Sequence, residues 1–114
     1  MHELGIVMHI VHTLEDVAAE NNLHKIGSVT LEVGEVSGVI HDQLLDAWDY
    51  FRKKSALVDG AELKLEVLPA VTYCSACERT YETVRYGRTC PYCGSGETWL
   101  EKGNECNIKE IEAE

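Results

Sequence analysis

The sequence lacks a long run of apolar residues. A membrane-spanning helix requires about 20 consecutive, mostly apolar residues, and no stretch of the 114-residue chain approaches this length. The chain also opens on Met1 to Leu4 without the positive charges that begin a secretory signal. We therefore expect a soluble, cytoplasmic protein with no membrane partner.

Positive charge is scarce as well. Ten Lys and Arg residues stand against 20 Asp and Glu residues, for a formal net charge of −10. Nucleic-acid binding requires a concentrated positive face, so this composition argues against nucleic acid as the main partner. From residue 73 to 102 acids and bases balance at four each, and the remainder carries 16 acids against 6 bases. Such a surface suits divalent cations or a basic protein partner, although a solvated acidic face without a specific role is the simpler explanation.

A catalytic constellation is also missing. Ser28, Ser37 and Ser55 have no convincing His/Asp setting, and the chain contains no glycine-rich phosphate loop. No internal repeat is present. We therefore expect a protein that is not an enzyme.

Four of the five cysteines form two pairs, Cys74-x2-Cys77 and Cys90-x2-Cys93, with twelve residues between them. Each pair can form a tight knuckle, and the insert lets the two knuckles face each other around one ion. Gly94 follows the second pair and suits a tight turn whose amides point at sulfur. The spacing predicts a closed, structural zinc site with no open position for catalysis.

Other uses of cysteine fit less well. Disulfides would leave one thiol over, and paired Cys-x-x-Cys motifs usually bind metal in cytosolic proteins. Redox catalysis would need a thioredoxin-like strand and helix, whereas Tyr73 and Thr89 precede the pairs in short extended segments. For Cys106 we expect a small buried thiol, with a surface disulfide or a fifth metal ligand as alternatives.

Hydrophobic periodicity predicts two helices. From Leu4 to Ala19 apolar residues recur at intervals of three and four, and Asn21 and Asn22 suit the end of this helix. A second helix is expected over residues 42–54, with Asp42 as its N-cap. Its buried stripe would comprise Leu44, Leu45, Ala47, Trp48 and Phe51.

Residues 28–35 and 61–68 alternate as half-buried strands, and residues 105–111 form a last strand. We expect the acidic ending, with Glu110, Glu112 and Glu114, to be a frayed, solvated tail. The side chains that would face the core are Val29, Leu31, Val33, Leu63, Leu65 and Val67. This order predicts an α+β protein: a small, mainly antiparallel sheet with two helices on one face, plus an inserted four-cysteine zinc-ribbon lobe. The domains would be residues 1–72 with 103–114, and residues 73–102 for the ribbon.

The first three residues are able to bind metal by themselves. A terminal amine, deprotonated amide nitrogens and the His2 imidazole can surround a cation in one plane, which suits Ni(II) or Cu(II). An ordinary disordered terminus explains the same residues. His9 and His12 lie three apart, close enough on a helix to share a metal, but exposed histidines without a role account for them more simply.

Several segments together carry a family resemblance. Met1-His2-Glu3-Leu4 opens the first helix, residues 32–39 read EVGEVSGV, and residues 62–66 read ELKLE before the four cysteines. Gly103-Asn104-Glu105 and the closing residues 108–112 extend the similarity. The chain resembles, over its whole length, the HypA/HybF family of nickel metallochaperones of [NiFe]-hydrogenase maturation.

The resemblance implies a nickel lobe made from both chain ends that carries an inserted zinc ribbon. Ni(II) would be the cargo, bound by Met1, His2 and Glu3, with imidazole nitrogen from His2 and backbone nitrogen from the segment. Zn(II) would be structural. The implied partners are the GTPase HypB and the hydrogenase large-subunit precursor, with urease maturation proteins as further candidates, and the chain would be a monomer or a homodimer.

The segment Ile40-His41-Asp42 departs from some relatives, which place a carboxylate near nickel just after the Ser-Gly-Val segment. His41 or Asp42 is a candidate for a transient or outer nickel contact, and a helix cap is the alternative role of Asp42.

A zinc-ribbon adaptor that binds nucleic acid or transcription machinery is the alternative function. Its best support is a set of arginines interleaved with tyrosines, namely Arg79, Arg85, Arg88, Tyr81 and Tyr86. The net acidity speaks against it. In a third interpretation the ribbon senses metal or redox state.

Overall fold

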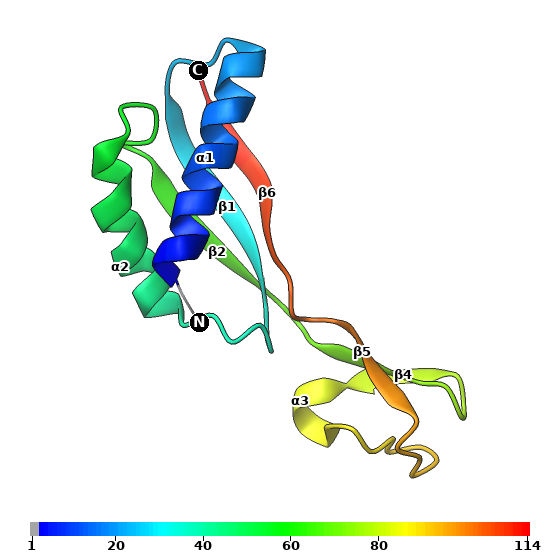
Figure 1. The fold of residues 1–114 in the computed structure, drawn as a ribbon. Coiled ribbons are helices and arrows are strands. Elements are labelled where there is room, and N and C mark those ends of the chain that lie inside the picture. Colours follow the sequence, from blue (N-terminus) through cyan, green and yellow to red (C-terminus); the bar gives the residue numbers. More distant parts are fainter. Residues whose placement is uncertain (1–2) are drawn as a thin grey trace. The chain divides into compact units, whose positions relative to one another are not determined.

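A computed structural model describes residues 3–114 (Figure 1). Two of the predicted nickel ligands, Met1 and His2, lie outside the described residues. The elements follow in the order α1 (Glu3–Asn21), β1 (Ile26–Gly34), α2 (His41–Phe51), the 3-10 turn η1 (Arg52–Lys54), β2 (Glu62–Leu68), β3 (Val71–Cys74), β4 (Arg79–Glu82), α3 (Thr83–Tyr86), β5 (Thr98–Lys102) and β6 (Cys106–Ala113). The predicted α+β class is confirmed.

The described chain divides into two compact units. The helical unit comprises the described part of Met1–Leu31 together with Val39–Glu66 and Asn107–Glu114. The ribbon unit comprises Glu32–Gly38 and Val67–Cys106. The predicted domains, residues 1–72 with 103–114 and residues 73–102, stay a prediction.

One sheet has the strand order β2-β1-β6, and α1 and α2 cover one of its faces (Figure 1). Strands β1 and β6 are antiparallel, because Glu114 N–H donates to the Lys25 carbonyl at one end and Gly34 N–H donates to the Glu105 carbonyl at the other, both at 2.8 Å. The arrows of β1 and β2 point the same way, with α2 as the crossover helix between them. The second sheet, in the order β4-β3-β5, is antiparallel throughout.

Long apolar side chains fill the core of the helical unit. Those with at most 2% of their surface exposed are Val7, Val11, Leu14, Ile26, Val29, Leu31, Leu44, Trp48 and Val58. Burying such a side chain contributes roughly 1.5–3 kcal/mol. Apolar burial is therefore the main favourable contribution to the stability of this unit.

Helix α1 forms where the periodicity predicts it. It ends as expected, because Asn22 takes a left-handed conformation (φ 55°) and Leu23 N–H donates to the Ala18 carbonyl at 2.9 Å. His9 and His12 are both exposed. No helix within residues 3–114, α1 included, is long and apolar enough to cross a membrane.

The predicted N-cap of α2 is wrong. The cap position is Ile40, which offers no side-chain hydrogen bond, and Asp42 lies inside the first turn. Two predicted core residues are also exposed, Leu45 at 37% and Val67 at 53%. Alternation and helical periodicity give the direction of a side chain, but they do not show whether another element packs over it.

Strand β1 is buried on both faces, although one solvated face was predicted. Ser28 and Thr30 are each only 6% exposed. The Ser28 hydroxyl donates to Glu112 Oε1 at 2.8 Å, and Lys64 Nζ lies 3.3 Å from the same oxygen. Side chains from both neighbouring strands therefore cover Ser28, which follows from the central position of β1.

The acidic end of the chain is paired in the sheet and not frayed as predicted, although its glutamate side chains are exposed to solvent as expected. Strand β6 continues to Ala113, and the Glu114 carbonyl accepts the His24 N–H at 2.7 Å. Main-chain pairing with β1 extends the strand despite the run of acidic side chains. Charge repulsion is therefore outweighed by the sheet.

Three segments of the ribbon unit pack with their backbones in direct contact, at Gly34, Ala70 and Gly103. A Cβ at Gly34 would collide with the Gly103 carbonyl, and one at Gly103 (φ +119°) would collide with Ala70. Val36 N–H donates to the Gly103 carbonyl, and Glu35 Oε1 accepts the Ala70 N–H, both at 2.9 Å. The EVGEVSGV and Gly103-Asn104-Glu105 segments thus form one structural feature.

Candidate metal centre

The four paired cysteines converge on one point in the ribbon unit. The Sγ atoms of Cys74, Cys77, Cys90 and Cys93 all lie within 4.8 Å of one another. The distances from Cys74 to Cys93 and from Cys77 to Cys90 are both 3.6 Å. In a tetrahedral site with metal–sulfur bonds of about 2.3 Å, neighbouring sulfurs lie about 3.8 Å apart. The cluster therefore has the size of a four-thiolate metal site such as that of zinc.

Two similar turns aim the sulfurs inward. Cys74 ends β3, and Cys77 lies in the turn to β4, after which Glu78 takes a left-handed conformation (φ 58°). Gly94 takes the same kind of conformation (φ 74°) after the second pair, and its N–H donates to the Cys90 carbonyl at 2.9 Å. The role expected for Gly94 is observed. The matching turn at Glu78 was not predicted, because its residue is not a glycine.

A very small core surrounds the sulfurs. It consists of Cys74, Cys90 and Tyr81, with Cys77 packed against it. The Tyr81 hydroxyl donates to the Gly87 carbonyl at 2.8 Å, which fixes the ring beside the cysteines. Two of the predicted ligands are thus the centre of the unit's own core.

The thiols differ in acidity. Burial, together with hydrogen bonds that the Cys77 thiol donates to the other thiols, raises the pKa of Cys77 to about 12. Burial also raises the pKa of Cys90, but backbone N–H groups of Cys93 and Tyr92 outweigh it and lower that pKa to about 7. A divalent cation at the centre would favour the thiolate form of every ligand.

Cys106 does not belong to the cluster. It is a half-buried free thiol at the start of β6, and burial raises the pKa of its side chain. Among residues 3–114, the thiols that approach one another are the four of the two pairs.

The second predicted site involves the start of the chain, where Glu3 is described. Its side chain is only 6% exposed, and its Oε2 accepts the backbone N–H of Ile40 at 3.3 Å. Ile40 is the cap position of α2, so the Glu3 carboxylate lies at the positive end of that helix. The sequence contained no local signal for this contact, since 37 residues separate the two groups.

His41 and Asp42 occupy the first turn of α2, directly after the residue that Glu3 contacts. His41 is half-buried and Asp42 is exposed. The first turn of this helix and the start of α1 therefore lie close together within the helical unit. The role of both residues at a nickel site stays a prediction.

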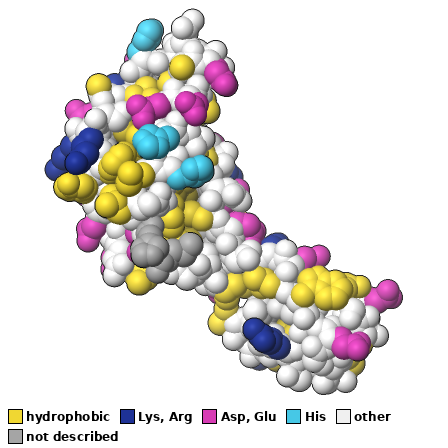
Figure 2. Space-filling model, in the orientation of Figure 1, with side chains coloured by type: hydrophobic (Ala, Val, Ile, Leu, Met, Phe, Trp, Pro, Cys, Tyr) yellow, Lys and Arg dark blue, Asp and Glu magenta, His cyan; other side chains and the backbone are white. Residues whose placement is uncertain are grey.

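Four of the five residues that favoured nucleic-acid binding make contacts within the ribbon unit. Tyr81 is only 6% exposed, so its ring is not available for stacking on bases. The guanidinium of Arg79 lies 5.0 Å from the centre of the Tyr92 ring, and that of Arg85 lies 5.3 Å from the Tyr86 ring. On the face drawn in Figure 2, acidic side chains are scattered over the surface, which fits a solvated acidic exterior.

Comparison with known proteins gives one consistent result. Residues 1–113 match the family model described as HypA, hydrogenase/urease nickel incorporation, metallochaperone. The hydrogenase maturation factor HypA of Albidiferax ferrireducens is 31% identical over the full length of both chains. The HypA of a Roseiflexus species is 34% identical, over all of this chain and 93% of its own.

A solved structure agrees with the sequence matches. The solution structure of the Ni metallochaperone HypA from Helicobacter pylori superimposes with a TM-score of 0.77 at 25% identity. The match covers 99% of this chain and 97% of the other. The chain therefore belongs to the HypA family, whose members are nickel metallochaperones of hydrogenase maturation rather than enzymes.

Proposed function

We propose that this chain binds Ni(II) through Met1, His2 and Glu3 and delivers it to the large-subunit precursor of a [NiFe]-hydrogenase. The observation that carries the proposal is the buried Glu3 carboxylate at the first turn of α2. A nickel segment at a chain end needs a fixed attachment, because a freely moving end pays a large entropic cost on binding. The hydrogen bond from Ile40 supplies that attachment.

The ligands would have distinct tasks. The His2 imidazole and backbone nitrogens of the first residues would form the square plane that Ni(II) favours. Glu3 would act through its position, because its carboxylate already contacts α2. His41 and Asp42, in the first turn of that helix, would hydrogen-bond the bound segment or contact the ion during transfer.

We assign the four-cysteine cluster to structural Zn(II). Four sulfur ligands at tetrahedral separations leave no open position, so the ion would hold the ribbon together rather than take part in transfer. Transfer would occur in the cytoplasm, together with the GTPase HypB, and urease maturation proteins are further candidate recipients of nickel. The acidic exterior is consistent with a partner other than nucleic acid.

Nickel titration of variants with single replaced histidines tests the proposal. In a protein that begins with the native Met1, His2→Ala is expected to lose most of its nickel affinity. His9→Ala is the matched control, because His9 is an exposed histidine on α1, and it is expected to bind as the wild type does. An extra residue ahead of Met1 is expected to weaken binding, since it displaces the terminal amine. Undiminished affinity in His2→Ala would refute the terminal site.

A second pair of variants tests the attachment. Glu3→Gln keeps an oxygen that accepts the Ile40 N–H, so nickel affinity is expected to remain near the wild-type value. Glu3→Ala removes the acceptor and is expected to weaken nickel binding roughly 10–100-fold, as is usual for groups that orient a ligand. Equal affinities of Glu3→Ala and Glu3→Gln would show that the contact with Ile40 plays no part.

A further inference from the structure

The ribbon unit contains a hollow apart from its four cysteines. The volume of the hollow is about 480 Å³, and its lining includes Val36, Thr72, Arg88, Trp99 and Leu100. Binding pockets in proteins have volumes of about 300–1,000 Å³ and combine apolar walls with a few polar groups. The hollow has both the size and the composition of such a pocket.

The threonine hydroxyls of the lining already have partners. Those of Thr72 in β3 and Thr83 in α3 lie 2.6 Å apart. The Thr98 hydroxyl in β5 donates to the carbonyl of Arg88, in the loop after α3, at 2.7 Å. These bonds join the strands to α3 and its loop, so they fix the walls of the hollow.

The charged group of the lining is the guanidinium of Arg88. Arg88 is exposed, and its side chain makes no ion pair, hydrogen bond or ring contact with another residue of the described range 3–114. Arg79 and Arg85, the other arginines of the ribbon unit, each lie over a tyrosine ring. Arg88 is therefore available to a ligand.

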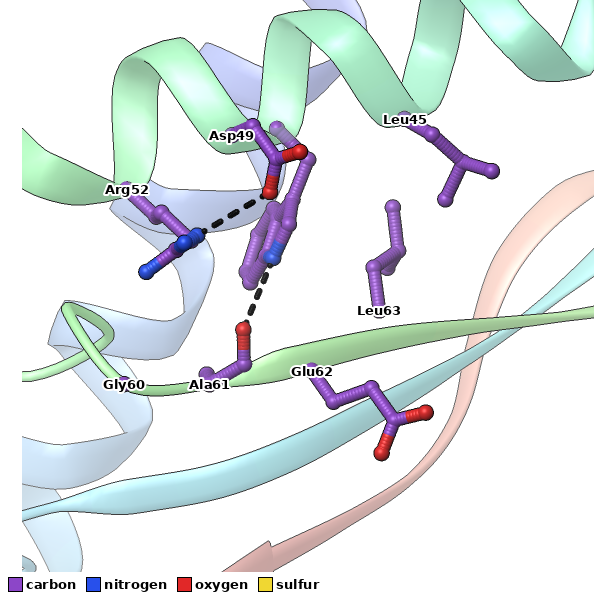
Figure 3. Close-up of a pocket in the computed structure, with 8 residues that line it drawn as sticks. Leu45, Asp49, Arg52, Gly60, Ala61, Glu62 and Leu63 are labelled. Carbon is purple, nitrogen blue, oxygen red and sulfur yellow. Dashed lines mark hydrogen bonds and ion pairs between the residues drawn. The ribbon is translucent and has the colours of Figure 1, made fainter.

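In the groove of the helical unit, by contrast, the arginine is already paired. This groove lies between α2 and the beginning of β2 and has a volume of about 410 Å³ (Figure 3). Arg52 Nε lies 3.2 Å from Asp49 Oδ1, and Arg52 also donates to the Asp59 carbonyl. The cation of this groove is thus neutralised, whereas that of the ribbon hollow is not.

Strand β5 lies at an edge of its sheet, beside the hollow. In the order β4-β3-β5 its neighbouring strand is β3. Thr98 and Leu100 share one face of β5 and line the hollow, because every second side chain of a strand shares a face. Trp99 belongs to the other face, where its ring lies 4.9 Å from that of Tyr73 and is 56% exposed.

An extended segment of another protein would match these features. Added beside β5, it would bond the free main-chain groups of the edge. Its side chains would alternate between the hollow and Trp99. A glutamate on the side of the hollow would bring its methylene groups to Leu100 and its carboxylate to Arg88, because the guanidinium fork matches a carboxylate.

The charge of the ribbon also permits an acidic ligand. Acids and bases balance at four each over residues 73–102, whereas the remainder of the chain carries 16 acids against 6 bases. An acidic segment is therefore repelled less by the ribbon than by the rest of the molecule.

We propose that the hollow and the β5 edge form a docking site for an extended segment of a partner protein. The segment carries a glutamate that pairs with Arg88, and the apolar residues on either side of this glutamate pack against Trp99. The site requires neither nickel nor the first three residues, so it goes beyond the proposed delivery of nickel.

Two synthetic peptides that differ in one charge test the site. They are acetyl-Thr-Val-Glu-Val-Thr-amide and its counterpart with Gln in place of Glu, and neither has a charged terminus. Binding to the isotope-labelled, zinc-loaded protein is followed through its amide signals in NMR spectra. The Glu peptide is expected to shift the amides of β5 and Arg88 saturably. The Gln peptide is expected to bind about tenfold more weakly, because it lacks the charge-assisted pair.

Substitutions of Arg88 connect this preference to one side chain. Arg88→Gln is expected to bind both peptides equally weakly, and Arg88→Lys, which keeps the charge, is expected to retain part of the preference for Glu. Arg79→Gln is the matched control, because Arg79 lies over the Tyr92 ring and is not part of the lining. It is expected to keep the full preference.

Several results would overturn the proposal. They are equal binding of the two peptides to the wild type, the absence of saturable shifts in β5, and a preference for Glu that survives in Arg88→Gln. A short oligothymidylate that shifts the β5 amides at lower concentration than the Glu peptide would also overturn it, because Arg88 would then serve phosphate. Nickel titration of Arg88→Gln is expected to match the wild type, which separates this site from the terminal nickel site.

Discussion

The two units of this chain differ in the side chains that stabilise them. The helical unit buries large aliphatic and aromatic side chains from two helices and a sheet. The buried cluster around the sulfurs of the ribbon unit consists of Tyr81 and two cysteines, with a third cysteine packed against it, and the other buried apolar side chains of this unit are Val33 and Ala70. Most other large side chains of the ribbon lie at its surface, including Val84, Tyr92 and Trp99, each more than half exposed.

The difference shows what the metal centre contributes. A unit of this size with so little apolar burial needs a crosslink to be stable on its own. Four cysteines within 4.8 Å of one another provide that crosslink once an ion binds them. The helical unit has a larger apolar core of its own. We therefore expect metal binding and folding to be linked in the ribbon unit and independent in the helical unit.

Removing the metal centre is expected to have the largest effect. Cys90→Ser, or a strong chelator, should unfold the ribbon unit while the helical unit stays folded, because the core of the helical unit contains none of the four cysteines. Each unit carries one tryptophan, Trp48 in the helical unit and Trp99 in the ribbon unit. Fluorescence of single-tryptophan variants therefore follows the two units separately.

A substitution in the core of the helical unit serves as the control. Leu14 is 1% exposed in α1, and Leu14→Ala is expected to destabilise the helical unit by about 2–5 kcal/mol. Its rate of zinc release to a chelator should remain that of the wild type. If Cys90→Ser lowers the denaturation midpoint reported by Trp48 as much as Leu14→Ala does, the two units are not independent.

Local features of the fold could be predicted from the sequence. The first helix followed from its apolar periodicity, and its end at Asn22 followed from the tolerance of asparagine for a left-handed backbone. The convergence of the four cysteines followed from their spacing. In each case the physical cause lies within a few residues, or in chemistry that allows few alternatives.

Contacts between distant segments could not be predicted. The α2 cap was assigned to Asp42 because a cap is usually local, whereas Glu3 provides the carboxylate from 37 residues away. The acidic end was expected to be frayed, yet it forms strand β6, and Glu112 bonds Ser28, 84 residues earlier in the chain. These contacts depend on which strands become neighbours. Charge and propensity along the sequence do not determine that choice.

Substitutions at the left-handed residue after each cysteine pair are expected to have a smaller effect on stability. Glu78 and Gly94 both follow a cysteine pair in a left-handed conformation, which is costly for a residue with a side chain. Glu78→Gly is expected to stabilise the ribbon unit by about 0.5–1 kcal/mol, and Gly94→Ala to destabilise it by a similar amount. Denaturation followed by Trp99 fluorescence measures both changes.

Glu78→Ala distinguishes backbone strain from charge. It removes the carboxylate but retains a Cβ, so the left-handed backbone remains unfavourable and no stabilisation is expected. Stabilisation by Glu78→Ala equal to that by Glu78→Gly would mean that the carboxylate, and not the backbone, is the unfavourable element of this turn.

Lowering the pH is expected to destabilise each unit through a different glutamate. This effect should be smaller than those of removing the metal centre and of changing the cysteine turns. Hydrogen bonds from Ser28 and Lys64 lower the pKa of Glu112 in the helical unit, and the backbone N–H of Gly103 lowers that of Glu105 in the ribbon unit. A carboxyl group with a lowered folded-state pKa stabilises the protein fully above its unfolded pKa of about 4.3. This stabilisation is lost as the pH falls through the lower, folded value.

Denaturation experiments at a series of falling pH values test both glutamates. Glu112→Gln should make the denaturation midpoint reported by Trp48 fall less steeply with pH, and Glu105→Gln should do the same for the midpoint reported by Trp99. A Glu112→Gln protein whose Trp48 midpoint declines as steeply as that of the wild type would mean that other groups carry the acid sensitivity of the helical unit.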